Sequence, residues 1–289
     1  MAAGTGPPST LNPAWNTAMW RRLLARLRPR PSPTGAEGCL DRPPLGTCLL
    51  FPRPSGPEGA TFVDGDGPRL ASYRIEEHPD AGWLLHFHGN GELAANYGQD
   101  GSGPLIGLGV NVAFAEYRGY GASTGDCTLQ ALLDDAESHL RALGVAPRRV
   151  VVYGRSLGSL AAIELAGRHP YLAGIVVESG IADVAERLLV RVDPAVVGLS
   201  RNAVAAEVAH HFDHRAKLSR YRGPLLVIHA EHDELVDSRH ARDLHAWGSG
   251  KDKELLLFPH GDHNTLIWLN RGTYRRTVQG FLDRVGLRG

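Results

Sequence analysis

From Leu49 onward, short apolar runs alternate with segments of helical periodicity, and this alternation limits the possible folds more than any other feature of the chain. Such a pattern is typical of a mostly parallel sheet that is covered by helices on both faces. The later runs are continuously apolar, as expected for strands buried on both faces. The runs that predict strands are 47–51, 60–63, 70–76, 82–88, 110–116, 149–153, 174–178, 225–230 and 254–258. We therefore expect an α/β fold.

Helical patterns lie between these runs. The segment 128–143 places apolar residues on one stripe, with Thr128 as the N-cap and Gly144 just past the end. Further helices are predicted at 159–168, 238–247 and 273–285. The stretch 182–218 is also helical in pattern, but it interrupts the alternation. An insertion there would lie above the carboxyl ends of the strands, where ligands bind in open α/β sheets, and we interpret it as a short lid within a domain at 44–289.

The sequence Gly154-Arg155-Ser156-Leu157-Gly158 joins a predicted strand to a predicted helix. Its glycines let the backbone reverse sharply and leave the serine hydroxyl on an exposed corner, as in a nucleophile elbow. The helix that follows offers free N–H groups where an oxyanion would form, and Leu157 N–H is the first of them. A second Gly-x-Ser-x-Gly match is centred on Ser123, but no strand precedes it directly, and we interpret that match as a loop.

A serine hydroxyl needs a base to take its proton and an acid to orient that base. His263 lies in a polar loop after the last predicted strand and is the predicted base, with His260 as the competitor. Asp233 follows the preceding strand and is the predicted acid; Glu231 and Asp237, in the same loop, are alternatives. Ser156, Asp233 and His263 then follow the order Ser, Asp, His, each after its own strand.

The second oxyanion donor should come from the loop after an earlier strand. The sequence His88-Gly89-Asn90-Gly91-Glu92 ends one such strand, and its glycines permit close approach of the backbone. We predict Asn90 N–H as this donor.

Three successive segments resemble landmarks of the α/β-hydrolase family: 86–91 (HFHGNG), 116–123 (EYRGYGAS) and 154–158 (GRSLG). They are most similar to its small-lid esterase and ABHD-like branch, and with the loops around Asp233 and His263 the resemblance covers about residues 47–285. It implies a mostly parallel eight-stranded sheet with helices on both faces, a short helical lid and a serine nucleophile. In the chain, Ala230 stands where relatives usually have glycine, and Asp262 is an extra residue before His263.

We expect a serine hydrolase that cleaves small-molecule carboxylic esters or thioesters (EC 3.1) through an acyl-enzyme. The alternatives are an amide or peptide hydrolase of the same fold, and a non-catalytic binding protein that retains it. No cofactor is expected. His210 and His214 have a spacing that can bind zinc, but no third ligand is indicated, so no metal is expected either.

Residues 1–43 differ from the rest, because they are rich in proline and alanine and lack acidic residues before Glu37. We predict an N-terminal extension with a short amphipathic helix at 14–27. We interpret this segment first as a tail whose apolar face docks on the domain. The alternative is a targeting element or weak contact with a membrane surface through the basic segment from Trp15 to Arg30. A formal net charge of zero gives no reason to expect nucleic acid as a partner. Three cysteines and no signal-peptide pattern favour a cytoplasmic location.

Overall fold

The computed structural model describes residues 38–41, 43–64, 67–98 and 103–288. Contacts within the chain divide it into two units, Met1–Pro31 and Ser32–Gly289, and the described residues all belong to the second. The helix predicted at 14–27 and the basic segment from Trp15 to Arg30 lie outside the described residues.

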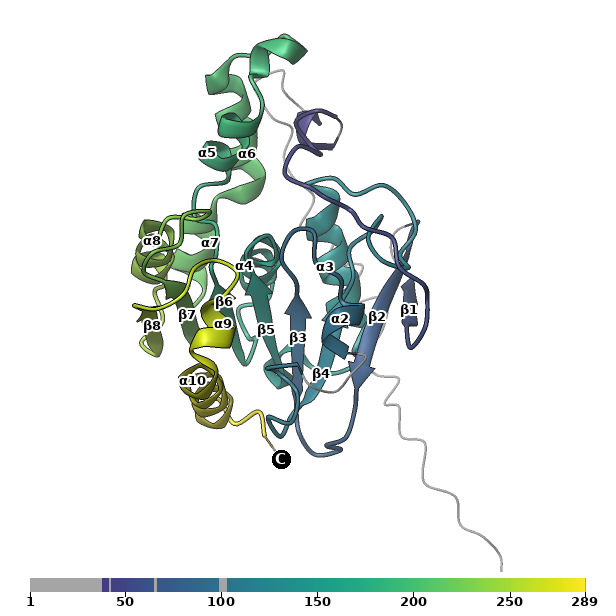
Figure 1. The fold of residues 1–289 in the computed structure, drawn as a ribbon, viewed down its shortest axis with the longest axis vertical. Coiled ribbons are helices and arrows are strands. Elements are labelled where there is room, and N and C mark those ends of the chain that lie inside the picture. Colours follow the sequence, from purple (N-terminus) through teal and green to yellow (C-terminus); the bar gives the residue numbers. More distant parts are fainter. Residues whose placement is uncertain (1–37, 42, 65–66, 99–102, 289) are drawn as a thin grey trace, which may run out of the picture. The chain divides into compact units, whose positions relative to one another are not determined.

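An eight-stranded sheet forms the centre of the second unit, in the order β1-β2-β4-β3-β5-β6-β7-β8 (Figure 1). The six strands from β4 to β8 along this order run parallel, whereas β1 and β2 are antiparallel to their neighbours. The predicted mostly parallel sheet is therefore confirmed. The strands are β1 (Thr61–Asp64), β2 (Arg69–Ile75), β3 (Trp83–Phe87), β4 (Asn111–Ala115), β5 (Val150–Arg155), β6 (Gly174–Glu178), β7 (Leu225–Ala230) and β8 (Lys253–Phe258).

Helices connect the strands and cover both faces of the sheet. The α-helices are α2 (Ala95–Gly98), α3 (Ala131–Ala142), α4 (Gly158–Arg168), α5 (Val184–Arg191), α6 (Arg201–Phe212), α7 (His214–Arg220), α8 (Arg239–Trp247), α9 (Leu266–Leu269) and α10 (Arg271–Arg284). Three short 3₁₀ turns, η1 (Cys39–Asp41), η2 (Pro147–Arg149) and η3 (Pro194–Val197), lie among them in the described part of the chain.

Each face of the sheet has its own hydrophobic core, because successive strand residues point to opposite faces. On one face, Val152 and Val177 pack with Leu132 of α3 and Leu160 of α4. On the other face, Val151 and Val176 of the same strands pack with residues of α2, α9 and α10. The sheet is thus fixed from both sides, and the loops at its carboxyl edge rest on a rigid frame.

Helices α5, η3, α6 and α7 all lie between β6 and β7, where the sequence interrupts its alternation. Helix α7 contacts α4 and α8 and so belongs to the layer that covers the sheet. Helices α5 and α6 contact each other and lie beyond the carboxyl ends of the central strands (Figure 1).

The strand predicted at 47–51 is not formed, and this prediction is wrong. Residues 43–49 form turns instead, closed by short-range bonds such as Cys48 N–H to Pro44 O at 2.9 Å. Prolines at 43, 44, 52 and 54 explain the difference, because proline lacks the N–H that a strand must donate to its neighbour. This segment, which we call the strap (residues 43–54), reaches the carboxyl edge of the sheet beside Asn90.

Candidate active site

Ser156 lies at the sharp turn between β5 and α4 and adopts φ of +50°, a left-handed conformation that is uncommon for residues other than glycine. The turn is also very tight. A Cβ at Gly154 would lie 2.4 Å from Gly158 O, and one at Gly158 would lie 2.1 Å from Phe87 O. Glycine is therefore required on both sides of the serine, and the strained backbone aims the hydroxyl out of the sheet edge.

The structure brings Ser156, His263 and Asp233 together in one hydrogen-bonded chain. His263 Nε2 is 2.9 Å from Ser156 Oγ, and His263 Nδ1 is 2.7 Å from Asp233 Oδ2. All three residues are less than 9% exposed. Each follows its own strand, β5, β7 or β8, so the parallel sheet places them at one edge although up to 107 positions separate them in sequence.

Asp233 is held as a carboxylate by several donors. Its Oδ1 accepts the N–H groups of Leu235 at 2.9 Å and Val236 at 2.8 Å. Its Oδ2 faces His263 and lies 3.3 Å from His229 Nε2. Burial alone would raise the pKa of Asp233, but the hydrogen bonds from His229 and His263 outweigh this effect and hold the pKa well below its ordinary value. An ionised Asp233 can orient the imidazole and stabilise its protonated form.

The alternative base and acids lie elsewhere. His260 is exposed and does not line the pocket around Ser156; its carbonyl accepts a bond from Asn270. Glu231 and Asp237 are both exposed. The extra Asp262 accepts the N–H groups of two residues that follow it and shapes the turn that presents His263.

The two residues predicted to supply the oxyanion amides lie beside Ser156. Leu157 and Asn90 both line the pocket, and within the described part of the chain neither N–H donates a hydrogen bond. The side chain of Asn90, in contrast, forms hydrogen bonds with the strap. Its Oδ1 accepts Phe51 N–H at 2.8 Å and its Nδ2 donates to Leu49 O at 2.6 Å, so it fixes the strap over this loop. The amides are therefore available to an oxyanion while the loop that carries Asn90 is held in place.

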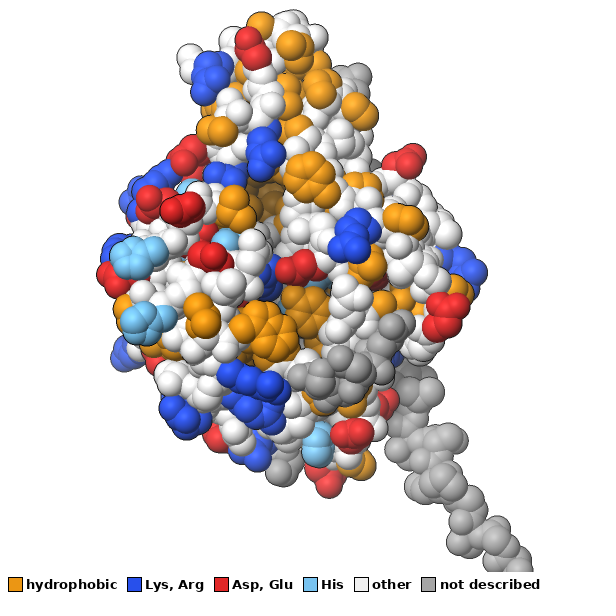
Figure 2. All heavy atoms as spheres, viewed as in Figure 1, with side chains coloured by type: hydrophobic (Ala, Val, Ile, Leu, Met, Phe, Trp, Pro, Cys, Tyr) orange, Lys and Arg blue, Asp and Glu red, His pale blue; other side chains and the backbone are white. Residues whose placement is uncertain are grey.

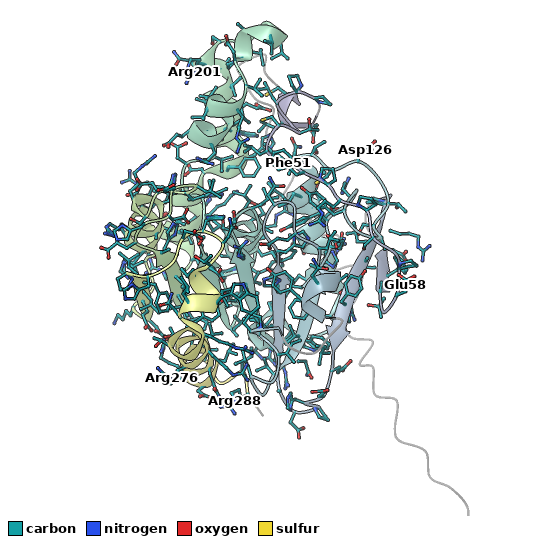
Figure 3. The ribbon with its side chains drawn as sticks, in the orientation of Figure 1. Phe51, Glu58, Asp126, Arg201, Arg276 and Arg288 are labelled. Atoms are coloured by element: carbon teal, nitrogen blue, oxygen red, sulfur yellow. The ribbon has the colours of Figure 1, made fainter. Side chains whose placement is uncertain are left out.

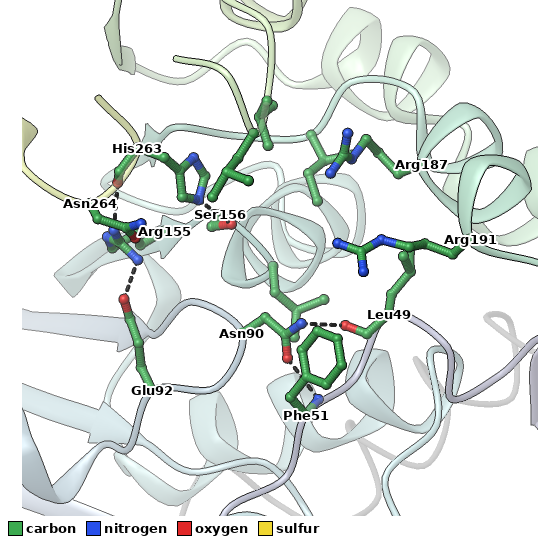
Figure 4. A pocket seen from close by; sticks show the side chains of 14 residues that line it. Leu49, Phe51, Asn90, Glu92, Arg155, Ser156, Arg187, Arg191, His263 and Asn264 are labelled. Carbon is green, nitrogen blue, oxygen red and sulfur yellow. Dashed lines mark hydrogen bonds and ion pairs between the residues drawn. The ribbon is translucent and has the colours of Figure 1, made fainter. Parts of the chain in front are cut away.

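The pocket in front of Ser156 has a volume of about 320 Å³ (Figure 4). The strap, the loop after β3, the elbow, helix α5 and the loops around Asp233 and His263 all contribute to its wall. The lining residues are Leu49, Phe51, Asn90, Glu92, Arg155, Ser156, Leu157, Ile181, Arg187, Arg191, Leu235, Val236, His263 and Asn264. Apolar side chains and arginines together thus surround the hydroxyl.

Arg155, which precedes Ser156, links three parts of the site and was not singled out from the sequence. Its Nη2 donates to His263 O at 2.7 Å, its Nε to Glu178 Oε1 at 3.2 Å, and its Nη1 is ion-paired with Glu92. Glu178 in turn accepts the hydroxyls of Tyr153 and Tyr274. An arginine directly before the serine is expected to be buried at the end of the strand, and a buried charge needs ion-pair partners. The position of Arg155 in the sequence could therefore have indicated such a network.

The remaining sequence candidates take structural positions. Ser123 Oγ accepts Ala71 N–H at 2.8 Å in the loop after β4, away from the pocket. His214 is buried with its Nδ1 3.0 Å from Ile181 O, whereas His210 is exposed. Among the residues that the structure describes, no cluster of His, Cys, Asp and Glu is arranged to hold a metal ion, and no helix is long and apolar enough to cross a membrane.

Comparison with known proteins identifies the relatives of this chain. It is 27% identical over 251 residues to YfhR, an uncharacterized protein of Escherichia coli K12, a match that covers 81% of this chain and 83% of that protein. It is 31% identical over 186 residues to human alpha/beta hydrolase domain-containing protein 17B, covering 60% of this chain and 58% of the human protein.

Solved structures show the same fold at low sequence identity. The esterase Pf2001 of Pyrococcus furiosus superimposes with a TM-score of 0.62 at 18% identity and covers 83% of this chain and 98% of its own. Mouse alpha/beta hydrolase domain-containing protein 10 gives a TM-score of 0.62 at 17% identity, covering 78% and 99%. The profile of the family described as serine aminopeptidase, S33, matches residues 78–201 and 181–267. The chain therefore belongs to this family of α/β-fold hydrolases and resembles its ABHD-like esterases.

Proposed function

We propose that this hydrolase cleaves carboxylic esters or thioesters through an acyl-enzyme formed on Ser156. The observation that carries the proposal is the continuous chain from Asp233 through His263 to the Ser156 hydroxyl, which ends in a pocket beside two backbone amides without partners among the described residues. A base within hydrogen-bond reach of the nucleophile, and an acid that orients the base, are what acyl transfer requires.

In this mechanism His263 Nε2 takes the proton of Ser156 as the Oγ attacks the carbonyl carbon of the substrate. The oxyanion that forms accepts the N–H groups of Leu157 and Asn90. His263 then gives its proton to the leaving alcohol or thiol, and the carbonyl reforms as the acyl-enzyme. A water molecule attacks this acyl group, again losing its proton to His263, and Ser156 recovers its proton when the acid is released.

We propose further that α5 and α6 form the lid of this site. Arg187 and Arg191 of α5 line the pocket, which supports the assignment. Val190, Val196 and Val197 are exposed on the same segment, and Figure 2 shows hydrophobic side chains gathered over α5 and α6. An apolar surface beside the pocket suits substrates with an apolar acyl chain.

The charges in the pocket favour ester over aminopeptidase activity. A site for a free N-terminus needs an unpaired carboxylate to bind the ammonium group. Among the described residues that line the pocket, Glu92 is the only carboxylate, and it is ion-paired with Arg155. We therefore expect higher kcat/KM on a p-nitrophenyl ester than on a peptide anilide of the same acyl group.

The nucleophile is tested by labelling with a fluorophosphonate probe and by ester hydrolysis. Ser156→Ala should abolish labelling and reduce kcat by about 10⁴-fold or more. Ser123→Ala is the matched control, since Ser123 stands in the same kind of motif outside the pocket. Labelling that persists in the Ser156 variant, or a folded protein that neither reacts with the probe nor hydrolyses any ester of the series, would show the proposal to be wrong.

A further inference from the structure

Two arginines of helix α5 line the pocket, and neither is ion-paired with an acidic residue that the structure describes. Arg187 and Arg191 are four positions apart, so they project from the same side of the helix. Figure 4 shows both side chains reaching from α5 toward the space in front of Ser156. Within the described part of the chain, neither guanidinium forms a hydrogen bond or an ion pair; Arg191 has only the ring of Phe51, 6.0 Å away.

The acidic residues of this region are committed to other groups. Asp183 caps the first turn of α5 by accepting Glu186 N–H at 2.8 Å. Glu186 itself is ion-paired with Arg239, outside the pocket. Glu186 interacts electrostatically with the adjacent Arg187 but does not line the pocket, so helix α5 contributes two positive charges and no negative charge to the pocket lining.

The third arginine of the pocket is neutralised. Arg155 lies between Glu92 and Glu178, which form ion pairs with it. No other acidic residue lines the pocket in the described structure, so the charges of Arg187 and Arg191 are not balanced by a carboxylate within the pocket lining. Forked guanidinium donors match the geometry of carboxylate and phosphate groups.

We propose that Arg187 and Arg191 form a subsite for an anionic group of the substrate, a carboxylate or a phosphate, held apart from the ester that is cleaved. The inference rests on the proposed function, because it assigns a substrate class to the same pocket. The apolar lining, Leu49, Phe51 and Leu235 among it, accommodates the carbon chain between the two ends. The substrate is then an ester or thioester with one charged end, carried either by the acyl chain or by the leaving group.

The test compares charged esters with their neutral counterparts. On the acyl side the pair is the p-nitrophenyl ester of adipic acid and that of monomethyl adipate. On the leaving-group side it is para-acetoxyphenylacetate and its methyl ester. For each protein the ratio of kcat/KM between the charged and the neutral ester is measured, so that a general loss of activity cancels.

In at least one pair, the wild-type ratio should exceed that of R187Q/R191Q by about tenfold or more. The pair that responds tells which side of the ester carries the charge. R187K/R191K should retain part of the preference, since charge remains but the fork is lost. Raising the salt concentration should lower the wild-type ratio, because Arg191 is exposed and its charge is screened.

Arg201→Gln is the matched control, because Arg201 is an exposed arginine at the start of α6 and does not line the pocket (Figure 3). Its charged-to-neutral ratios should equal those of the wild type. Ratios that are the same in R187Q/R191Q and in the wild type for both pairs would overturn the proposal. Circular dichroism and thermal unfolding of each variant verify that the protein keeps its overall helical content and stability.

A binding measurement separates this inference from the proposed reaction. In a Ser156→Ala background, monomethyl adipate and dimethyl adipate are titrated and followed by ligand-observed NMR. The anion should bind more tightly than the diester, and the difference should disappear when R187Q/R191Q is added. Arginine-dependent anion binding without any ester hydrolysis by the wild type would refute the proposed function and keep the subsite. Hydrolysis of neutral esters without arginine-dependent binding would overturn the subsite and leave the proposed function standing.

Discussion

At the scale of single residues, the carboxylate of Asp233 is surrounded by donors from three directions. The amides of Leu235 and Val236 hold one oxygen, and two imidazoles face the other. Each of these groups favours the ionised over the protonated form. We therefore expect Asp233 to stabilise the folded protein as well as to orient His263.

We predict that Asp233→Asn lowers the free energy of unfolding at pH 7 by about 2–4 kcal/mol. Because the folded pKa of Asp233 is below its unfolded value of about 3.9, this contribution is complete above that value and is lost as pH falls through the folded pKa. The difference between wild type and variant should thus shrink as the pH is lowered from about 5 to about 3. Urea unfolding at several pH values measures it. A difference that stays constant with pH would contradict this account.

Arg155 is predicted to be a positioning residue rather than a catalytic one. Arg155→Gln leaves Glu178 buried without its cation and frees the carbonyl of His263, and we expect a loss of about 3–5 kcal/mol in stability. Burial alone would raise the pKa of Glu92, but Arg155 outweighs this and lowers it, so the ion pair matters to both partners.

Arg155→Lys separates these two effects. It keeps the charge between Glu92 and Glu178 but lacks the third arm toward His263. Stability should recover in part, while kcat stays below that of the wild type with KM nearly unchanged. If kcat recovered together with stability, the bond to His263 would have no positioning role.

The sequence allows site residues to be predicted where they directly follow a predicted strand. Ser156, His263 and Asp233 could be proposed because the carboxyl ends of parallel strands meet at one edge. Arg187 and Arg191 could not be assigned, since their direction depends on how α5 packs above the sheet. The partners of Arg155 could not be assigned either, because Glu92 lies in the loop after β3 and Glu178 ends β6, and their approach to Arg155 depends on the order of the strands in the sheet.

At the scale of elements, β5, the elbow and α4 form one rigid unit. Gly158 begins α4 and lies against the backbone at the end of β3, where a Cβ would be 2.1 Å from Phe87 O. Backbone atoms cannot move aside as a flexible side chain can. The helix therefore approaches the sheet as closely as it does only because glycine stands at this position.

We predict that Gly158→Ala destabilises the protein by about 2–4 kcal/mol and disturbs the Leu157 amide, which lowers kcat. Gly280→Ala is the matched control in α10, because a Cβ there meets no atom within 4 Å and its backbone is helical. Alanine at position 280 should stabilise the protein by about 0.5–1 kcal/mol. Thermal unfolding and ester hydrolysis of both variants provide the comparison. Equal stability of the two would refute the close-packing argument.

Elements with strong local patterns were predicted with small errors. The helix expected at 128–143 forms as Ala131–Ala142, with Thr128 Oγ1 accepting Ala131 N–H at 3.1 Å. Within the strap, the short apolar run at 47–51 predicts a strand that does not form. The backbone of Leu49 and Phe51 is held instead by hydrogen bonds with the Asn90 side chain, and both residues line the pocket, which periodicity does not reveal.

At the scale of the whole molecule, the candidate site is contained in the second unit of the chain. The catalytic candidates, both candidate oxyanion amides and both cores lie between residues 38 and 288. Cys39 and Leu40 are buried in the first core, so that core extends beyond the domain boundary predicted at residue 44. A truncation that spares the hydrolase must therefore end before these residues, and the unit boundary at Pro31 meets this condition.

We predict that a chain without residues 1–31 keeps kcat/KM on a water-soluble ester within about twofold of the full chain, because no group of the site is removed.

We propose that the same deletion abolishes binding to anionic vesicles, since Trp15, Trp20 and the arginines from 21 to 30 are lost with it. Vesicle sedimentation at low and high salt measures binding. A full-length variant with those arginines changed to glutamine isolates the charges from the tryptophans, and should bind weakly at either salt concentration. Vesicle binding that survives the deletion would place the membrane contact in the second unit, where the exposed valines of α5 and η3 are the surface to test next.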